Sequence, residues 1–418
     1  MPETGPSSRD PYSNPDLFRF TGSMEGVPDF LDLAETQAER ESRRGWRAQG
    51  HAWFDRAGHL LPGLVLAALL ALLGRMVSKG LGGGVLGVDS SPLSPILIAV
   101  VAGLVVRNSL GLPSVFEKGL QVCVKKVLRV GVALLGMQIS LVAVAEIGLV
   151  ALPLVVVCIA TALAVVRFVS RALALPDRLG TLIAVGTAIC GNTAIVATAP
   201  VLGASDDETS YAVGTITVFG LLALIVYPFL SYSLFGGNDF AAGIFLGTAI
   251  HDTSQVAGAA LLYSQQFVAP ETLEVATVTK LIRNAFMVVV IPLFAWLHGR
   301  HRAGTFRPQL GFFELVPIFV LGFLALAGFR TLGDLGEEPF GGLLSPGAWE
   351  TLIAITSEVS VVCLAVAMAA IGLGTHLSRL TVLGMRPLVA GFAAAAAVGG
   401  MSFVAIRWIG PAFASLFI

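Results

Sequence analysis

Charged residues are scarce in this chain of 418 residues: Asp, Glu, Lys and Arg make up 13% of it, whereas hydrophobic residues make up 55%. Soluble domains carry about 25% charged residues, and one globular core could not bury so much apolar side chain. The composition therefore excludes an ordinary soluble enzyme. It predicts an all-α polytopic membrane protein whose partner over most of its surface is the lipid bilayer.

Other absences exclude further classes of protein. The formal net charge of −1 gives no basis for a nucleic-acid partner. The chain has no GxxxxGK[ST], HExxH or GxSxG motif and no pair of GxGD-type aspartates, which argues against ATP-driven transport and intramembrane proteolysis. We therefore expect no enzyme activity. We also expect no cofactor, metal site or disulfide framework, because the cysteines lie in or beside apolar runs without a CxxC pair: Cys123, Cys158, Cys190 and Cys363.

What the chain does contain begins with a polar extension, residues 1–58, rich in Pro, Ser, Glu and Arg. Its early part predicts disorder, and 29–56 predicts an amphipathic helix on the membrane surface. Residues 59–418 predict one transmembrane domain. Eleven apolar stretches lie near 60–80, 93–107, 127–145, 147–168, 179–203, 211–234, 240–263, 275–297, 309–330, 351–374 and 384–410. Gly, Pro and polar residues interrupt several of them, so a different number of spans is open.

The basic residues predict the orientation. With eleven spans, most Lys and Arg fall on the N-terminal side of the membrane, and the opposite side receives Arg75, Lys79, Arg330 and Arg407. Basic residues are enriched in cytoplasmic loops, so we expect a cytoplasmic N-terminus and a C-terminus on the other side. An odd number of spans also fits one extra helix added to two five-helix repeats.

Two pairs of segments resemble one another. GTAICGNTAIVATA (186–199) resembles GTAIHDTSQVAGAA (247–260), and ALLGMQISLVAVAEIG (133–148) resembles AAIGLGTHLSRLTVLG (369–384). Membrane helices rich in Gly and Ala resemble each other easily, which is one interpretation. A true duplication would indicate the repeat construction of secondary transporters, whose substrate site lies near the midplane where the repeats meet.

Gly191, Asn192 and Thr193 interrupt the fifth apolar stretch. Glycine and a side chain that competes for backbone hydrogen bonds predict a broken helix here. Its exposed N–H groups would bind an anion. The alternative is close helix packing with an interhelical hydrogen bond from the asparagine.

The seventh stretch contains five consecutive polar residues, His251, Asp252, Thr253, Ser254 and Gln255. One helix face could not hide all five from lipid, so part of the segment should line a cavity or an unwound turn. The last three are candidate substrate contacts. The first two are candidates for an ion pair or for coupling transport to an ion, because imidazole titrates near neutral pH. A structural network between helices is the alternative.

Lys280 and Arg283 lie three residues apart, hence on one helix face. A charge at the bilayer centre costs about 2.5–3.5 kcal/mol on insertion scales, so we expect a negative partner. Asp252, Glu358 or an anionic substrate would serve, since guanidinium binds oxyanions well. The alternative is that Lys280 and Arg283 lie near the end of a span and extend their charged groups to the membrane surface.

Thr375 and His376 follow two glycines at the end of the tenth stretch. They predict another interrupted helix with substrate contacts, or else a histidine at a helix end in the membrane interface.

The segments GMQIS, AICGNTAIVATAPV, IHDTSQVAGA, TKLIRN and AMAAIGLGTH, in this order, resemble the bacterial sulfate exporter family of YeiH-like membrane proteins over roughly residues 60–418. The resemblance implies a fold similar to sodium/proton antiporters and bile-acid symporters, with about 11 transmembrane helices, inverted five-helix repeats and broken crossing helices. It also implies transport of a small anion, a bacterial inner (plasma) membrane location with a periplasmic C-terminus, and a homodimer. The sequence departs from the family pattern at Gln138, at Asn192 and Thr193, and at Ala199, which leaves a substrate other than sulfate or sulfite open.

The function that these patterns favour is secondary transport of a small anion by alternating access, with coupling to H+ or Na+ left open. The resemblance implies that the anion contains sulfur. A cation/proton antiporter is the alternative, in which Asp252 binds the ion and Lys280 competes with it. A channel is also open, because interrupted helices build selectivity filters as well.

Overall fold

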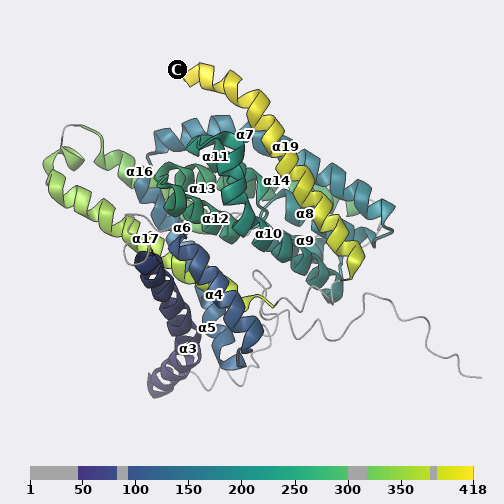
Figure 1. Ribbon diagram of the computed structural model, residues 1–418, viewed down its shortest axis with the longest axis horizontal. Helices are drawn as coiled ribbons and strands as arrows, with labels where there is room; N and C mark the ends of the chain where they lie inside the picture. Colours follow the sequence, from purple (N-terminus) through teal and green to yellow (C-terminus); the bar gives the residue numbers. More distant parts are fainter. Residues whose placement is uncertain (1–45, 82–92, 300–317, 337, 377–383, 418) are drawn as a thin grey trace, which may run out of the picture.

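The computed structural model describes residues 46–81, 93–299, 318–336, 338–376 and 384–417, and these residues form helices and no β-strand (Figure 1). The α-helices are α3 (Trp46–Lys79), α4 (Pro95–Ser109), α5 (Glu117–Val122), α6 (Leu128–Leu135), α7 (Leu141–Ala172), α8 (Asp177–Ala188), α9 (Asn192–Leu202), α10 (Asp206–Phe235), α11 (Asp239–Ala249), α12 (Thr253–Phe267), α13 (Pro270–Ala285), α14 (Met287–Gly299), α16 (Ile318–Gly333), α17 (Pro346–Gly374) and α19 (Met385–Phe417). The π-helical segment η5 (Cys123–Val127) joins α5 to α6, and the short helices η4 (Ser114–Phe116), η6 (Gly136–Gln138) and η7 (Pro339–Gly342) lie in connections.

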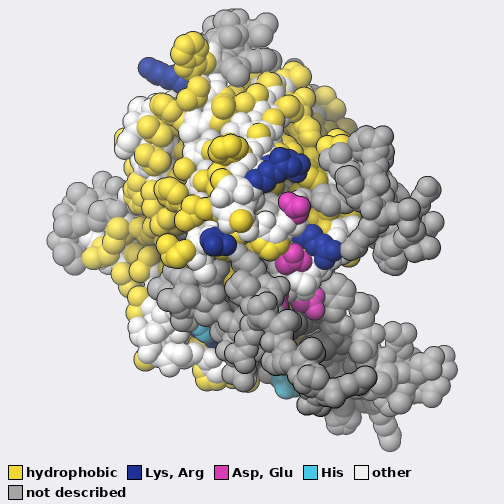
Figure 2. All heavy atoms as spheres, turned by 90° about the vertical axis from the view of Figure 1, so that its right-hand side faces the viewer, with side chains coloured by type: hydrophobic (Ala, Val, Ile, Leu, Met, Phe, Trp, Pro, Cys, Tyr) yellow, Lys and Arg dark blue, Asp and Glu magenta, His cyan; other side chains and the backbone are white. Residues whose placement is uncertain are grey.

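Six segments of the described helices are long and apolar enough to cross a membrane. They are Gly58–Lys79, Leu141–Ala172, Asp206–Phe235, Pro270–Phe294, Pro346–Gly374 and Met385–Trp408. Apolar side chains cover most of the visible described surface in Figure 2, and the charged side chains on that face are few, most of them in its middle and to the right. These features fit a multi-pass membrane protein. The number eleven and the inverted repeats stay predictions.

One predicted boundary is wrong. The third apolar stretch was expected over 127–145, but the helical run begins at Glu117 and continues through η5 and α6. The turn to the next helix falls at Ser140, whose Oγ accepts a hydrogen bond from the N–H of Ala143 at 3.2 Å and caps α7. Because apolar residues lie on both sides of this turn, hydropathy alone does not predict its position.

The N-terminal extension is described from Trp46 onward. Residues 46–58 are helical and continue without a break into the first apolar stretch as part of α3. The rest of the predicted amphipathic helix, residues 29–45, lies outside the described residues, so its place on the membrane surface stays a prediction.

The helices form two groups. In the first, which we call the α17 group, α17 packs against α3, α4 and α6, and α16 packs against α6. In the second, the α13 group, α13 packs against α7, α11 and α12, and α19 packs against α7 and α11 (Figure 1). Helix α8 packs against α7, α9 and α10, so these helices belong to the α13 group as well. The groups meet where α12 contacts α4 and α17 and where α7 contacts α16.

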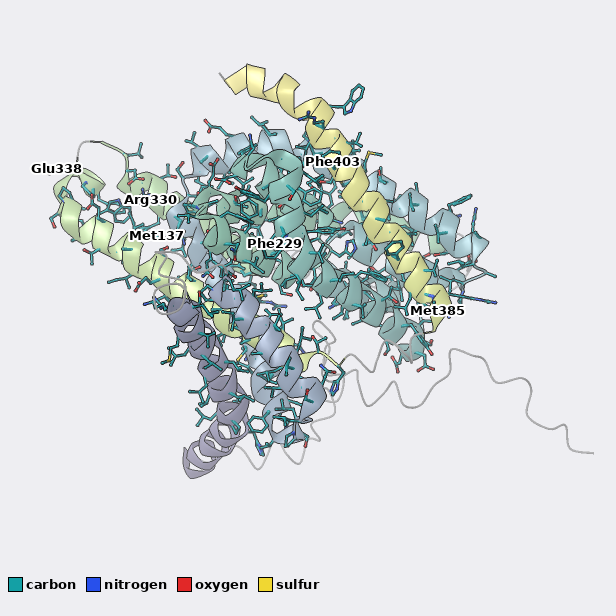
Figure 3. All side chains as sticks on the ribbon, viewed as in Figure 1. Met137, Phe229, Arg330, Glu338, Met385 and Phe403 are labelled. Atoms are coloured by element: carbon teal, nitrogen blue, oxygen red, sulfur yellow. The ribbon has the colours of Figure 1, made fainter. Side chains whose placement is uncertain are left out.

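Close packing inside the α17 group depends on small residues. A Cβ atom at Gly103 of α4 would lie 2.8 Å from the backbone nitrogen of Leu373 in α17. Only glycine allows the two backbones to approach so closely, as is common between helices in membranes. At the far end of α16, Arg330 forms an ion pair with Asp334, with 2.7 Å between Nε and Oδ2, away from the centre of the molecule (Figure 3).

Two helices of the α13 group are interrupted. The first breaks between α8 and α9, where Gly191 has a φ of 70°, and the second breaks between α11 and α12, where Asp252 is the N-cap. Both predicted interruptions are therefore confirmed. They fall at matching places in the first pair of similar segments, since Ala188 and Ala249 each end a helix after the shared GTA residues.

The third predicted interruption is described in part. Helix α17 ends at Gly374, and Thr375 and His376 follow in extended or irregular conformation. The course of the chain after them lies outside the described residues.

Candidate functional site

The two interruptions meet at Asp252. Its Oδ1 accepts hydrogen bonds from the backbone N–H of Ser254 at 2.9 Å and from the Ser254 hydroxyl at 2.6 Å. Its Oδ2 accepts a hydrogen bond at 3.3 Å from the backbone N–H of Asn192, the first residue of α9. One buried carboxylate thus caps α12 and binds the N-terminal end of α9, where the helix dipole is positive.

Gly191 makes this junction possible. Its positive φ is unfavourable for other residues, and a Cβ at this position would lie 2.7 Å from Asp252 Oδ2. As the N-cap of α9, it provides no side chain to bind the first-turn N–H groups. One of these groups, the N–H of Asn192, is bound by the carboxylate of Asp252, and helix geometry directs the others toward the space before the helix.

Lys280 holds the opposite ends of the interrupted helices. Its ammonium donates hydrogen bonds to the carbonyl oxygens of Ile189 and Ile250, each at 3.0 Å, and to that of His251. These carbonyls lie just beyond the C-terminal ends of α8 and α11, where helix dipoles are negative.

Arg283, one turn further along α13, also donates hydrogen bonds to carbonyl oxygens at the C-terminal ends of α8 and α11. Its Nε donates to Ala188 O at 2.8 Å, its Nη1 donates to Thr248 O at 2.5 Å, and its Nη2 donates to Thr187 O. Both cationic side chains are buried and border neither described cavity. Among the described residues, neither forms an ion pair with Asp252 or Glu358. This geometry favours a structural role for Lys280 and Arg283 over the predicted contact with an anion.

A cavity of about 620 Å³, open to solvent, lies before the N-terminal ends of α9 and α12, and we call it the junction cavity. One wall consists of polar residues of the α13 group, together with one cysteine: Cys190, Asn192, Thr193, Asp252, Thr253, Ser254 and Asn284. The other comes from η5, α6 and α16: Val124, Lys125, Leu128, Arg129, Val132 and Phe319. Five of the predicted site residues therefore lie together, and Gly191 is adjacent to them.

Hydrogen bonds fix the polar wall. Asn192 Nδ2 donates to Thr217 Oγ1 at 3.1 Å, which ties α9 to α10. Asn284 Nδ2 donates to Thr253 Oγ1 at 3.1 Å, which ties α13 to α12. These bonds orient the amide and hydroxyl groups that face the cavity.

A second cavity lies on the other side of Val124 and Lys125, and we call it the α17 cavity. Its lining includes three of the predicted site residues, Gln255, Thr375 and His376, which are therefore separated from the junction cavity. At its edge Arg107 donates from Nε to His376 Nε2 at 2.7 Å. Arg107 also forms an ion pair with Glu117 at 3.1 Å, so the α17 group is held together around this cavity.

The structure does not show the predicted ion pair of His251 with Asp252. The ring of His251 is buried, borders neither described cavity, and has no hydrogen-bond partner for either nitrogen among the described residues. The carboxylate of Asp252 caps the helix instead. Of the two candidates for ion coupling, only Asp252 lines a described cavity.

Sequence reasoning missed Lys125, Arg129 and Asn284. Lys125 and Arg129 were counted with the cytoplasmic basic residues around 107–129, Lys125 before the expected start of the third stretch at 127 and Arg129 just inside it. A signal was available: Leu120, Val124, Leu128 and Val132 are spaced four apart and continue a helical period upstream of that boundary. The π-helical turn at Lys125, a feature frequent at functional sites, has no comparable signal in the sequence.

A chain whose described residues form several helices of membrane length, with interrupted helices that meet at a polar cavity, is a polytopic membrane protein. The chain belongs to the family described as conserved hypothetical protein 698, whose model matches residues 62–391.

The curated relatives are bacterial. A UPF0324 membrane protein of Fusobacterium nucleatum is 31% identical over 339 residues, which cover 79% of this chain and 93% of the relative. One from Streptococcus agalactiae serotype V is 31% identical over 335 residues, covering 80% and 92%. Another from Bradyrhizobium diazoefficiens is 30% identical over 358 residues, covering 85% and 94%. Their names describe membrane proteins without a substrate. No solved structure matches the chain.

Proposed function

We propose that the protein is a secondary transporter that carries a small anion across the bacterial inner membrane by alternating access and binds it in the junction cavity. The observation that carries this proposal is the arrangement of helix ends. The positive ends of α9 and α12 face the cavity, and Lys280 and Arg283 neutralise the negative ends of α8 and α11 behind it.

The cavity also offers donors suited to an anion. Lys125 and Arg129 lie on the wall opposite the helix ends, and Asn192, Thr253 and Asn284 offer amide and hydroxyl groups. Half-helix N-termini directed at an anionic group are a recurring device of transporters with interrupted helices. Sulfur-containing anions are the class implied by the resemblance to sulfate exporters.

The two helix groups support alternating access. Residues of both groups border each cavity, and Val124 and Lys125 of the α17 group border both. Movement of one group against the other would change which cavity is continuous with the helix junction. The site would then be exposed to each side of the membrane in turn.

The proposal includes further features that rest on the sequence and on the family resemblance. These are eleven transmembrane helices in inverted five-helix repeats, a cytoplasmic N-terminus with residues 1–58 as an extension, a periplasmic C-terminus, a homodimer, coupling to H+ or Na+, and the absence of enzyme activity.

A cation/proton antiporter is the second candidate, and one observation favours it: the carboxylate of Asp252 lines the junction cavity. Against it, both oxygens of that carboxylate already accept hydrogen bonds from N–H and O–H donors. A cation would have to displace these donors.

The test is a thermal-unfolding screen of the purified protein with sulfate, sulfite, thiosulfate, sulfonates, small carboxylates and Na+. A ligand that binds only the folded state raises Tm by mass action. We expect an anion to raise Tm, and we expect Lys125→Met to remove the effect. Lys126→Met is the matched control, because its exposed side chain borders neither described cavity. A rise with Na+ alone would favour the antiporter.

A further inference from the structure

Arg107 is buried at the edge of the α17 cavity and is held there by partners of two kinds. Its Nε donates to His376 Nε2 at 2.7 Å, which its Nη2 also contacts, and its Nη1 donates to the carbonyl oxygen of Leu112 at 3.1 Å. Both acceptors are neutral, because an imidazole nitrogen that accepts a hydrogen bond carries no proton. The third partner is the carboxylate of Glu117, whose Oε1 accepts from Nη2 at 3.1 Å. Of the three partners, only Glu117 neutralises the guanidinium.

The ion pair of Arg107 with Glu117 is unequal in exposure. The side chain of Arg107 is 3% exposed, whereas that of Glu117 is 37% exposed. Among the described residues, this carboxylate has Arg107 as its one side-chain partner. The neutral partners therefore fix the guanidinium, while the carboxylate can turn away into solvent by a change of its own rotamer.

Departure of the Glu117 carboxylate would leave a buried cation without a negative partner. Such a charge is costly, because it has lost its hydration without gaining an opposite charge. A small oxyanion in the α17 cavity would restore the pair, since Arg107 lines this cavity and guanidinium binds oxyanions well. Exchange of one anion for another keeps the guanidinium paired before and after.

The α17 cavity also lies where an approach to the junction cavity is needed. Val124 and Lys125 of η5 border both cavities, so these residues separate a ligand beside Arg107 from the helix junction. Under the proposed orientation, the basic residues around 107–129 face the cytoplasm. The α17 cavity is then the cytoplasmic approach to the junction cavity.

We propose that Arg107 forms a second anion site, in which the transported oxyanion replaces the carboxylate of Glu117 on its way to the junction cavity. Glu117 holds the place of the anion while the site is empty, and His376 is a positioning residue that keeps the guanidinium directed at the cavity. This inference rests on the proposed function, because it assigns an access site to the same pathway.

The experiment is thermal unfolding of the full-length purified protein and of Glu117→Gln over a range of sulfate and thiosulfate concentrations. The amide keeps the shape of the side chain and removes its charge. Tm without these anions should fall, because Arg107 loses its negative partner. The anion should reverse this fall and should bind about tenfold more tightly than to the wild-type protein, as expected for a charged hydrogen bond that no longer has a competitor.

Glu350→Gln is the matched control, because this exposed glutamate of α17 borders neither described cavity. Sulfate stabilises folded proteins in general at high concentration, and the shift of the control variant measures that effect. Glu117→Asp keeps the charge on a shorter side chain, so it should tighten binding less than the amide does. It also provides a test if Glu117→Gln does not fold.

The location of the gain is tested in Asn284→Ala, since Asn284 lines only the junction cavity. The tighter binding caused by Glu117→Gln should persist in this background, and its loss there would contradict a site at Arg107.

The outcomes separate the two proposals. If sulfate and thiosulfate bind equally to the wild-type protein, both Glu117 variants and Glu350→Gln, the access site is wrong while the anion site of the junction cavity stands. If Glu117→Gln lowers Tm and neither anion reverses the fall, Glu117 has only a structural role. If neither the wild-type protein nor any variant binds an anion, both proposals fail.

Discussion

The carboxylate of Asp252 accepts a hydrogen bond from the backbone N–H of Asn192 across 3.3 Å, and so joins the beginnings of two helices that are 60 residues apart in the chain. The same carboxylate caps its own helix through Ser254. The positive ends of α9 and α12 are thereby held side by side. Backbone geometry thus stabilises negative charge at this point, and the carboxylate of Asp252 supplies it.

Asp252→Asn separates the two candidate functions. The amide can accept hydrogen bonds through only one atom, so one N–H donor loses its partner, and we expect a loss of about 1–3 kcal/mol of stability. Removal of the negative charge should leave anion binding intact or tighter. The measurement is Tm with and without the stabilising anion. Loss of every response to Na+ and pH, with no anion response in the wild-type protein, would instead support the antiporter.

Gly191→Ala tests the junction itself. A side chain is strained at the φ of 70° and ψ of −125° of Gly191, and the added Cβ would also lie 2.7 Å from Asp252 Oδ2. We expect a clear drop in Tm and loss of transport. Gly236→Ala is the control for a positive φ, because Gly236 has a φ of 61° with no atom within 4 Å of the added Cβ, although its ψ of 33° is more favourable for alanine than the −125° of Gly191. Equal effects of the two substitutions would show that the contact with Asp252 is unimportant.

Lys280→Met and Lys125→Met are the same substitution with different expected results. The first removes the donor to three backbone carbonyls, at about 1–3 kcal/mol for each one left unsatisfied, so the folded protein should become unstable. The second should lower Tm without ligand less than the first, and it should weaken anion binding roughly 10- to 100-fold, as expected for a lost charged hydrogen bond. Thermal unfolding and binding on both variants provide the comparison. The opposite pattern would place the anion at Lys280.

A tether between the helix groups tests alternating access. The backbone N–H of Ser94, at the start of α4, donates to Oε1 of Gln266 in α12 at 2.9 Å, so these residues lie across the contact between the groups. Cysteines at both positions, joined by a short cross-linker, should stop transport without loss of anion binding. The two single-cysteine variants, treated alike, control for the four native cysteines. Full transport by the tethered protein would contradict relative movement of the groups.

The interrupted helices could be predicted from the sequence, because Gly191 with Asn192, and the run from His251 to Gln255, place turn-forming and polar residues where an apolar helix would have none. The matching GTAI segments indicated that the two breaks are alike. Five of the residues expected at the site do surround one cavity.

The roles of the charged residues could not be predicted. Lys280 and Arg283 lie on one helix face, as their spacing requires, but the sequence does not show whether that face meets a ligand or the carbonyl ends of neighbouring helices. Lys125 was missed for a related reason: its helix begins at Glu117, and a charged residue beside an apolar stretch resembles a loop residue. Tertiary packing decides both cases.

The central claim is that this protein exchanges an anion through the site where α9 and α12 meet, and counterflow tests it most directly. Proteoliposomes are loaded with the anion that stabilises the purified protein most, and entry of its labelled form is followed. The account predicts transient accumulation of label above its equilibrium level, strongly reduced in Lys125→Met and retained in Lys126→Met. Entry no faster than into protein-free liposomes, or flux that the internal anion does not stimulate, would contradict it.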